Sequence, residues 1–312
     1  MTSDRTPHWR AAVRRALAIA LLVLVPCTGA LAAGQRTFAT PEAAVAALAA
    51  ALKADNEAEL VAIVGEQHRN LIVSGDRAGD KERHEKAAAL LGEFHALDDR
   101  NPNRVVVLVG AQAWPLPIPI VRDGTAWRFA SEVGAEEMLN RRIGAGERNA
   151  LLVLRAYVAA QRDYASVDRN GDGVLEYAQR LASSPGKFDG LYWPEDPKSG
   201  VERSPLGPLI AQTSLAASDR KPGDPYEGYR FRILKRQGPG APGGAYNYVV
   251  NGHMVAGFAM VAYPDAYGET GVSTFIVNQN GRIFEKDLGP GTRGIAEKMV
   301  AFDPKGWRES ED

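Results

Sequence analysis

The stretch 147–164 constrains the fold of this chain most strongly. Apolar residues recur there at helical spacing on two sides, with Leu154 and Val158 on one and Val153 and Tyr157 on the other. A helix that is apolar on two sides must be largely covered by other elements. The sequence therefore predicts a long helix that is wrapped by the rest of its domain.

Short β-strands are predicted after this helix, beyond a long coil rich in Gly, Pro, Ser and Asp at 185–225. The strand candidates are 229–234, 246–251, 258–263, 273–278 and 283–286. Asn280 and Gly281 separate the last two and form a typical hairpin turn. We therefore expect a C-terminal α+β domain, 144–312, in which the long helix packs on an antiparallel sheet. Gly144 and Gly146 are interpreted as the point where this domain and its helix start.

The segment before it predicts a second α+β domain, 34–143. Thr40 followed by Pro41 is a helix-start signal. The threonine hydroxyl can cap the first turn. Proline has no N–H, but the first N–H groups of a helix have no partner within the helix, so nothing is lost there. Helices are expected from there, at 57–64 and at 81–97. Strands are expected at 104–109, 113–121 and 126–129, with the turn at 123–124. Helices followed by a strand–turn–strand unit resemble a nuclear-transport-factor-two-like α+β cone, and a linker helix at 136–142 should join the domains.

The first 33 residues have the pattern of a secretory signal peptide. Arginines precede an apolar run at 16–25, which is shorter than the ~20 residues that span a bilayer. Ala30, Leu31 and Ala32 then place small residues where a signal peptidase cleaves. Cys27 leaves lipidation as an alternative, although proline just before it fits a lipobox poorly. We expect export to the periplasm or the cell surface, with no membrane span after cleavage.

Charge and cysteine content exclude some classes of function. The formal net charge is -1, whereas a nucleic-acid-binding domain is strongly basic. Cys27 is the single cysteine, so the mature chain holds no disulfide and no thiolate zinc site. Its stability must come from core packing, which a chain of 312 residues can supply.

An acidic glycine loop follows the long helix and is a candidate calcium site. Asp168, Asn170, Asp172 and the following glycine have the oxygen-ligand spacing of a calcium loop. Gln179 stands where such a loop has a bidentate glutamate, so Glu176 or Asp163 would have to substitute. The alternative is a plain turn, because Asp, Asn and Gly favour turns in any case. Calcium is the one cofactor the sequence suggests, in a structural role.

Aromatic residues of the coil and the strands suggest a binding surface. Tyr and Trp are rigid and amphipathic, which suits grooves for a peptide or a glycan. The candidates are Tyr192, Trp193, Tyr226, Tyr229 and Tyr246. The alternative is that these rings cap the sheet and hold the coil against it.

No catalytic constellation is visible in the sequence. The histidines after residue 33 form no His-x-x-x-His or Glu-x-x-His pair, and no Gly-x-Ser-x-Gly elbow is present. The glycine-rich stretch 238–244 lacks the Gly-Lys-Ser/Thr of a phosphate loop. The sequence therefore favours a protein that is not an enzyme.

Four segments of the chain resemble a known family. The segments 177–187, 189–194, 238–244 and 284–289 are similar to the bacterial family called domain of unknown function 2950. This resemblance covers nearly the whole mature chain. It implies no activity, because the family is uncharacterised.

The C-terminal half also resembles the globular heads of pseudopilins. The matching positions, in order, are Glu147, Ala150, Leu154, Arg155, Ala160, Gln161, Tyr164, Gly228, Tyr229, Phe231, Pro264, Gly268, Thr270, Gly271, Phe275, Gly281 and Ile283. A pilin helix continues N-terminally into a membrane stalk, whereas here Gly144, Gly146 and another domain precede it. The resemblance therefore implies a pilin-like head without a filament.

These features together predict an exported, non-catalytic binding or envelope-assembly module, with an envelope protein or a glycan as its partner. One alternative is an envelope hydrolase whose site is covered by the coil 185–225. A second alternative is a structural module stabilised by calcium. The sequence indicates no oligomeric state.

Overall fold

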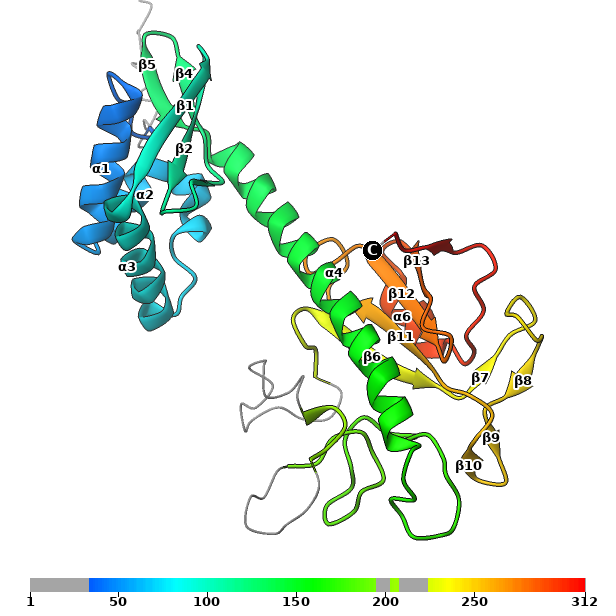
Figure 1. Cartoon of the computed structure of the whole chain (residues 1–312). Coiled ribbons are helices and arrows are strands. Elements are labelled where there is room, and N and C mark those ends of the chain that lie inside the picture. Colours follow the sequence, from blue (N-terminus) through cyan, green and yellow to red (C-terminus); the bar gives the residue numbers. More distant parts are fainter. Residues whose placement is uncertain (1–33, 195–202, 208–223, 312) are drawn as a thin grey trace, which may run out of the picture.

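The computed structural model describes residues 34–194, 203–207 and 224–311 (Figure 1). The predicted signal peptide, with Cys27, lies outside these residues, as do parts of the predicted coil 185–225. Helices and antiparallel sheets form two bodies joined by one long helix, which confirms the predicted α+β class.

The N-terminal body starts with helices whose ends follow the capping signals. These are α1 (Pro41–Lys53), α2 (Glu57–Val64), the 3₁₀ helix η1 (Glu66–Leu71) and α3 (Arg77–Glu93). The Thr40 hydroxyl accepts the Ala43 N–H at 3.2 Å, as predicted. Gly65 ends α2 with a φ of 88°, a conformation that glycine adopts without strain.

A small antiparallel sheet packs on these helices. Its strands are β1 (His95–Asn101), β2 (Arg104–Val109), β3 (Trp114–Pro115), β4 (Ile120–Asp123) and β5 (Ala126–Phe129), in the order β1-β2-β4-β5 with β3 paired to β2. The core between helices and sheet contains Leu60, Ile63, Val107 and Ile120.

The structure corrects the predicted helix 81–97. It ends at Glu93, and His95–Asn101 is a strand instead. His95 pairs with Val109 and Leu97 with Val107, so the valine-rich β2 recruits this segment by main-chain hydrogen bonds. Tertiary pairing therefore overrides a local sequence that is rich in Asp and Arg and poor in β-formers.

A single helix, α4 (Ser131–Tyr164), connects the bodies. The sequence predicts a linker helix at 136–142 and a separate helix that starts after Gly146. The structure corrects this prediction, because one helix runs through 144–146 without interruption. A Cβ on Gly146 would lie 2.5 Å from the Thr270 carbonyl oxygen and 3.2 Å from the Glu227 carbonyl oxygen. The glycine thus serves close packing, which offsets the ~1 kcal/mol that glycine costs inside a helix.

The C-terminal body is built on a five-stranded antiparallel sheet. Its strands are β6 (Tyr229–Leu234), β11 (Ala259–Pro264), β12 (Ser273–Asn278), β13 (Ile283–Asp287) and β14 (Arg308–Glu309), in the order β14-β13-β12-β11-β6. Two hairpins extend from it, formed by β7 (Arg236–Gln237) with β8 (Tyr246–Asn247) and by β9 (Val249–Val250) with β10 (His253–Met254). Helix α6 (Thr292–Lys298) and β14 were not predicted.

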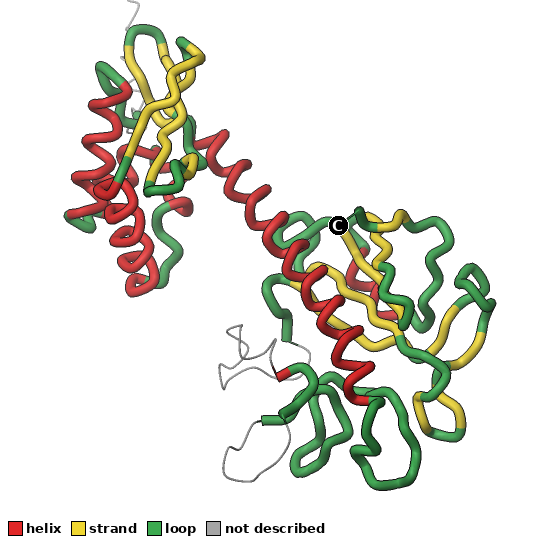
Figure 2. Tube along the Cα trace, in the orientation of Figure 1, coloured by secondary structure: helices red, strands yellow, loops and turns green. Residues whose placement is uncertain are grey.

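The second half of α4 packs on β6, β11 and β12. Leu154 and Tyr157 are fully buried there, and the Tyr157 ring meets Phe258 edge-on with centroids 5.5 Å apart. Long loops after α4 gather at the far end of this helix (Figure 2). They form the candidate site described below.

Within the described part of the chain, no helix combines the length and the apolar character needed to cross a bilayer.

Candidate functional site

A buried glutamine near the end of α4 positions the site. Gln161 is fully buried, and its Nε2 donates to the Ala178 carbonyl oxygen at 2.8 Å and to the Tyr157 hydroxyl at 3.0 Å. Its Oε1 accepts the Ala178 N–H at 2.8 Å. The side chain therefore replaces a strand partner for Ala178 and fixes the segment 176–179 against the helix.

The β9–β10 hairpin holds the same segment from the other side. The Tyr177 N–H donates to the Met254 carbonyl oxygen at 2.8 Å, and the Met254 N–H donates to Glu176 Oε2 at 3.1 Å. Gln179 Nε2 donates to the Gly252 carbonyl oxygen at 2.7 Å. Side chains of 176–179 are thus fixed between two elements that are distant in sequence.

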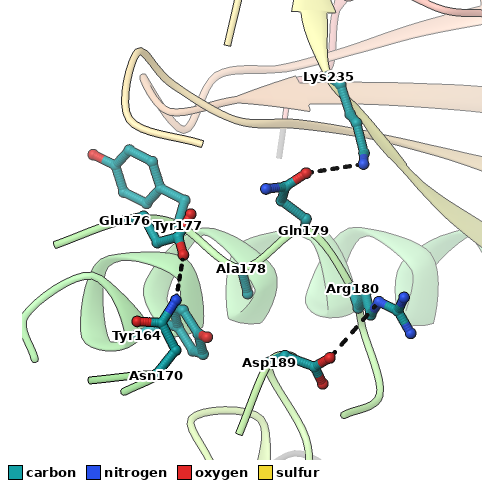
Figure 3. Close-up of a pocket in the computed structure, with 9 residues that line it drawn as sticks. All are labelled: Tyr164, Asn170, Glu176, Tyr177, Ala178, Gln179, Arg180, Asp189 and Lys235. Carbon is teal, nitrogen blue, oxygen red and sulfur yellow. Dashed lines mark hydrogen bonds and ion pairs between the residues drawn. The ribbon is translucent and has the colours of Figure 1, made fainter. Parts of the chain in front are cut away.

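A polar pocket of about 300 Å³ opens beside this segment (Figure 3). Its lining residues are Tyr164, Asn170, Glu176, Tyr177, Ala178, Gln179, Arg180, Asp189 and Lys235. Lys235 Nζ donates to Gln179 Oε1 at 2.9 Å, and Arg180 Nε lies 4.0 Å from Asp189 Oδ2. The pocket presents cations, carboxylates and amides together, and Tyr164 and Tyr177 contribute to its lining.

Burial and neighbouring groups shift the pKa values of two ionisable groups of the pocket. Burial by itself raises the pKa of Asp189, but hydrogen bonds from the Ser184 N–H and hydroxyl, together with Arg180, outweigh it and lower the pKa. Burial, assisted by the charges of Glu176 and Asp189, raises the pKa of Tyr164 to about 12. The Tyr164 hydroxyl therefore stays protonated at neutral pH and donates to the Phe188 carbonyl oxygen at 2.7 Å.

The predicted calcium loop is closed by its own hydrogen bonds. Asp168 accepts the Gly171 and Gly173 N–H groups, both at 2.8 Å, one on each carboxylate oxygen. These bonds, that from Gly173 first, lower the pKa of Asp168. Asn170 Nδ2 donates to Asp172 Oδ2 at 2.8 Å and to Glu176 Oε1 at 2.9 Å. Of the four predicted ligands, the structure brings Asp172 and Glu176 together through Asn170, while Asp168 serves the loop backbone.

A histidine that sequence reasoning did not select completes this arrangement. His253 Nδ1 lies 3.5 Å from Asp172 Oδ2 and 3.5 Å from Glu176 Oε2. The three ligand atoms lie within 4.8 Å of one another. His253 comes from β10, and no spacing pattern in the sequence links it to the loop. It is brought there by the pairing of the hairpin with 176–179.

The five aromatic candidates do not form one surface groove. Trp193, Tyr226 and Tyr229 are buried, and the Tyr229 hydroxyl donates to the Ser273 carbonyl oxygen at 2.8 Å. Tyr192 is partly buried, and its N–H donates to the Leu181 carbonyl oxygen beside the pocket. Tyr246 is exposed and packs edge-on against Tyr248. Three of the five rings are therefore buried in the described structure.

A second pocket, of about 400 Å³, lies where the N-terminal sheet meets the start of α4. Its lining residues are Arg104, Val106, Pro115, Leu116, Pro117, Pro119, Val133, Glu136, Glu137, Asn140 and Arg141. Arg141 donates to Glu137 at 2.7 Å and to the Pro115 carbonyl oxygen at 3.0 Å, so its guanidinium holds α4 to the sheet. The polar pocket of the C-terminal body is the stronger candidate, because it gathers polar groups of both signs from separate segments beside a potential ligand set.

Comparison with known proteins identifies one family. The family model described as "Protein of unknown function (DUF2950)" matches residues 35–310. No curated protein and no solved structure matches the chain.

Proposed function

This chain belongs to the DUF2950 family, whose function is unknown, and we propose that it acts as an exported, non-catalytic binding module of the cell envelope. The observation that carries the proposal is the polar pocket of the C-terminal body. Arg180 and Lys235 supply donors, Glu176 and Asp189 supply acceptors, and Tyr177 contributes to the lining of the same pocket. These groups are held in place by main-chain bonds and by Gln161, so the pocket is formed before a ligand arrives.

The chemistry of this pocket suits a glycan. A sugar unit offers hydroxyl groups that donate and accept, and apolar C–H faces that stack on tyrosine rings. The volume of about 300 Å³ is at the small end of the ~300–1,000 Å³ of ligand pockets. It therefore fits the end or one residue of an envelope glycan, with the remainder of the chain outside. An envelope protein that presents a polar terminus is the other partner class.

Hydrogen bonds within the protein hold the carboxylates of the pocket in fixed positions. Both oxygens of Glu176 accept hydrogen bonds, from Asn170 and from the Met254 N–H. Both oxygens of Asp189 accept hydrogen bonds from Ser184. These bonds fix the orientation of both carboxylates, and each oxygen keeps a second lone pair that can accept a hydrogen bond from a ligand.

The envelope location rests on the sequence. Residues 1–33 carry the pattern of a cleaved signal peptide, and the pseudopilin-like order of residues in the C-terminal half is that of proteins assembled at the envelope. Mass spectrometry of the protein made in a Gram-negative host should find a mature N-terminus near Ala32 or Ala33. Recovery of the full-length chain from the cytoplasm would count against export.

Removing the lysine of the pocket should weaken glycan binding. Lys235→Met is expected to lower the affinity for insoluble cell-wall glycan by about tenfold, because a hydrogen bond to a charged group contributes ~1.5–3 kcal/mol. Cosedimentation with purified cell-wall glycan measures this. Lys53→Met, on the last turn of α1 in the other body, is the matched control and should bind like wild type. Equal binding by wild type and Lys235→Met would refute the assignment of the pocket.

The convergence of Asp172, Glu176 and His253 supports a second candidate function, an envelope hydrolase. These groups lie beside the pocket and are of the types that move protons in hydrolysis. In that case the purified protein releases soluble fragments from cell-wall glycan, and His253→Ala, whose side chain is not among the residues lining the pocket, abolishes the release while binding persists. Binding without any release by wild type identifies the non-catalytic function.

A further inference from the structure

We infer that Asp172, Glu176 and His253 form a binding site for a divalent first-row transition metal, with Zn²⁺ as the representative ion. The inference goes beyond the proposed function, and it is tested apart from it because Zn²⁺ binding is measured without a glycan. It also differs from the predicted calcium loop, because its third ligand is an imidazole from β10.

Two of the three distances between the ligand atoms match those of a metal site. Zinc bonds of about 2.1 Å at tetrahedral angles place two ligand atoms about 3.4 Å apart. His253 Nδ1 lies 3.5 Å from Asp172 Oδ2 and 3.5 Å from Glu176 Oε2. The third pair, Asp172 and Glu176, lies within 4.8 Å, so a shift of one carboxylate toward the other brings all three ligands within reach of one ion.

The donor set distinguishes between metals. Imidazole suits Zn²⁺, Ni²⁺ and related ions, whereas Ca²⁺ takes 6–8 oxygen ligands. Here one of the three donors is an imidazole nitrogen, and only two are carboxylates. Two carboxylates with a neutral imidazole also balance a divalent charge. The site therefore favours a transition metal over calcium.

Neighbouring groups orient the two carboxylates, as the outer shell of a metal site does. The Asn170 amide donates to both of them, at 2.8 and 2.9 Å. The Val174 N–H donates to Asp172 Oδ1 at 2.9 Å, and the Met254 N–H donates to Glu176 Oε2 at 3.1 Å. The hairpin that carries His253 is bound to the same segment through the Tyr177 N–H. Loop and hairpin are thus joined before an ion binds.

Three protein ligands leave a tetrahedral ion with one open position. Glu176 also lines the polar pocket, so the ion would lie at the pocket wall. Metal binding would connect the loop that follows α4 to the β9–β10 hairpin. We therefore expect the bound ion to stabilise this end of the C-terminal body, because a ligand that binds only the folded state raises the melting temperature.

Isothermal titration of ZnCl₂ into the metal-stripped protein tests the inference. Wild type should bind one Zn²⁺ per chain in the micromolar range or tighter. His253→Ala and Asp172→Asn should each weaken binding by about tenfold or more. His95→Ala removes an exposed histidine of the other body and should leave Zn²⁺ binding unchanged. Melting temperatures should rise with Zn²⁺ for wild type and His95→Ala, and not for His253→Ala.

Three results would overturn the inference. The first is no Zn²⁺ binding by wild type, and the second is equal binding by wild type and His253→Ala. The third is tighter binding of CaCl₂ than of ZnCl₂, which would instead support the calcium loop of Asp168, Asn170, Asp172 and Glu176. Circular dichroism of each variant without metal checks that the variant is folded. If His253→Ala does not fold, Asp172→Asn serves as the second variant, because Asp172 is exposed.

Discussion

Replacing Gln161 by methionine should lower the free energy of unfolding by about 3 kcal/mol, since each buried polar group left without a partner costs ~1–3 kcal/mol. Methionine fills a similar volume but offers no amide. The N–H and the carbonyl oxygen of Ala178, both of which bond Gln161, would lose these partners in a fully buried position. Chemical denaturation followed by circular dichroism measures the change.

Leu152→Ala is the matched control for this variant, because Leu152 is exposed on the same helix. It should change the free energy of unfolding by less than about 0.5 kcal/mol, as is usual for surface positions. A Gln161→Met protein as stable as wild type would show that Gln161 does not fix the segment 176–179. Other contacts would then have to hold the pocket residues of this segment in place.

Replacing each of two glycines of α4 by alanine should change the free energy of unfolding in opposite directions. Gly146→Ala is expected to lower the free energy of unfolding by about 2 kcal/mol, because overpacking a filled contact costs ~1–3 kcal/mol. The new Cβ would meet the Thr270 carbonyl oxygen at 2.5 Å, and this oxygen belongs to the backbone. Gly144→Ala should raise the free energy by about 0.5–1 kcal/mol, since alanine is the better helix former.

The Gly144 variant works as the control because its surroundings are permissive. The nearest atom to its Cβ is Arg148 Nη1 at 3.3 Å, the end of a flexible side chain that can move away. Thermal or chemical denaturation of both variants measures the pair. Equal effects of the two substitutions would contradict the view that Gly146 serves packing against the C-terminal body.

Much of the architecture is readable from local chemistry. The Thr40–Pro41 cap starts α1, and Gly65 ends α2. Strands 229–234 and 273–278 are found at their predicted positions, because alternating apolar residues and turn residues mark them. The domain division at 143–144 stays a prediction, although the helix itself runs through that point.

The errors have a common physical cause, which is the contact between distant segments. Strand β1 forms because β2 is available as a partner, and its own residues, such as Asp98 and Asp99, do not favour a strand. Gly144 and Gly146 resemble a helix boundary until the packing of Gly146 on Thr270 is known. Local patterns do not contain this information.

In the candidate site, too, local patterns identify some residues and contacts between distant segments determine others. The loop spacing selects Asp172 and Glu176, which the structure links through Asn170, and their role as metal ligands stays a prediction. His253 belongs to the arrangement only through the hairpin pairing, which no motif encodes. The aromatic residues were selected by type, and type alone does not distinguish a buried ring such as Tyr229 from an exposed one such as Tyr246.

The continuity of α4 makes the two bodies geometrically dependent on each other. A flexible linker would absorb the insertion or loss of a residue, but a helix turns by about 100° and advances by about 1.5 Å for each one. One residue inserted between Arg142 and Ile143 would therefore rotate the N-terminal body about the helix axis by more than a quarter turn. Chain length in this connection sets an orientation, so related proteins that keep both bodies in the same relation must keep the number of residues between them.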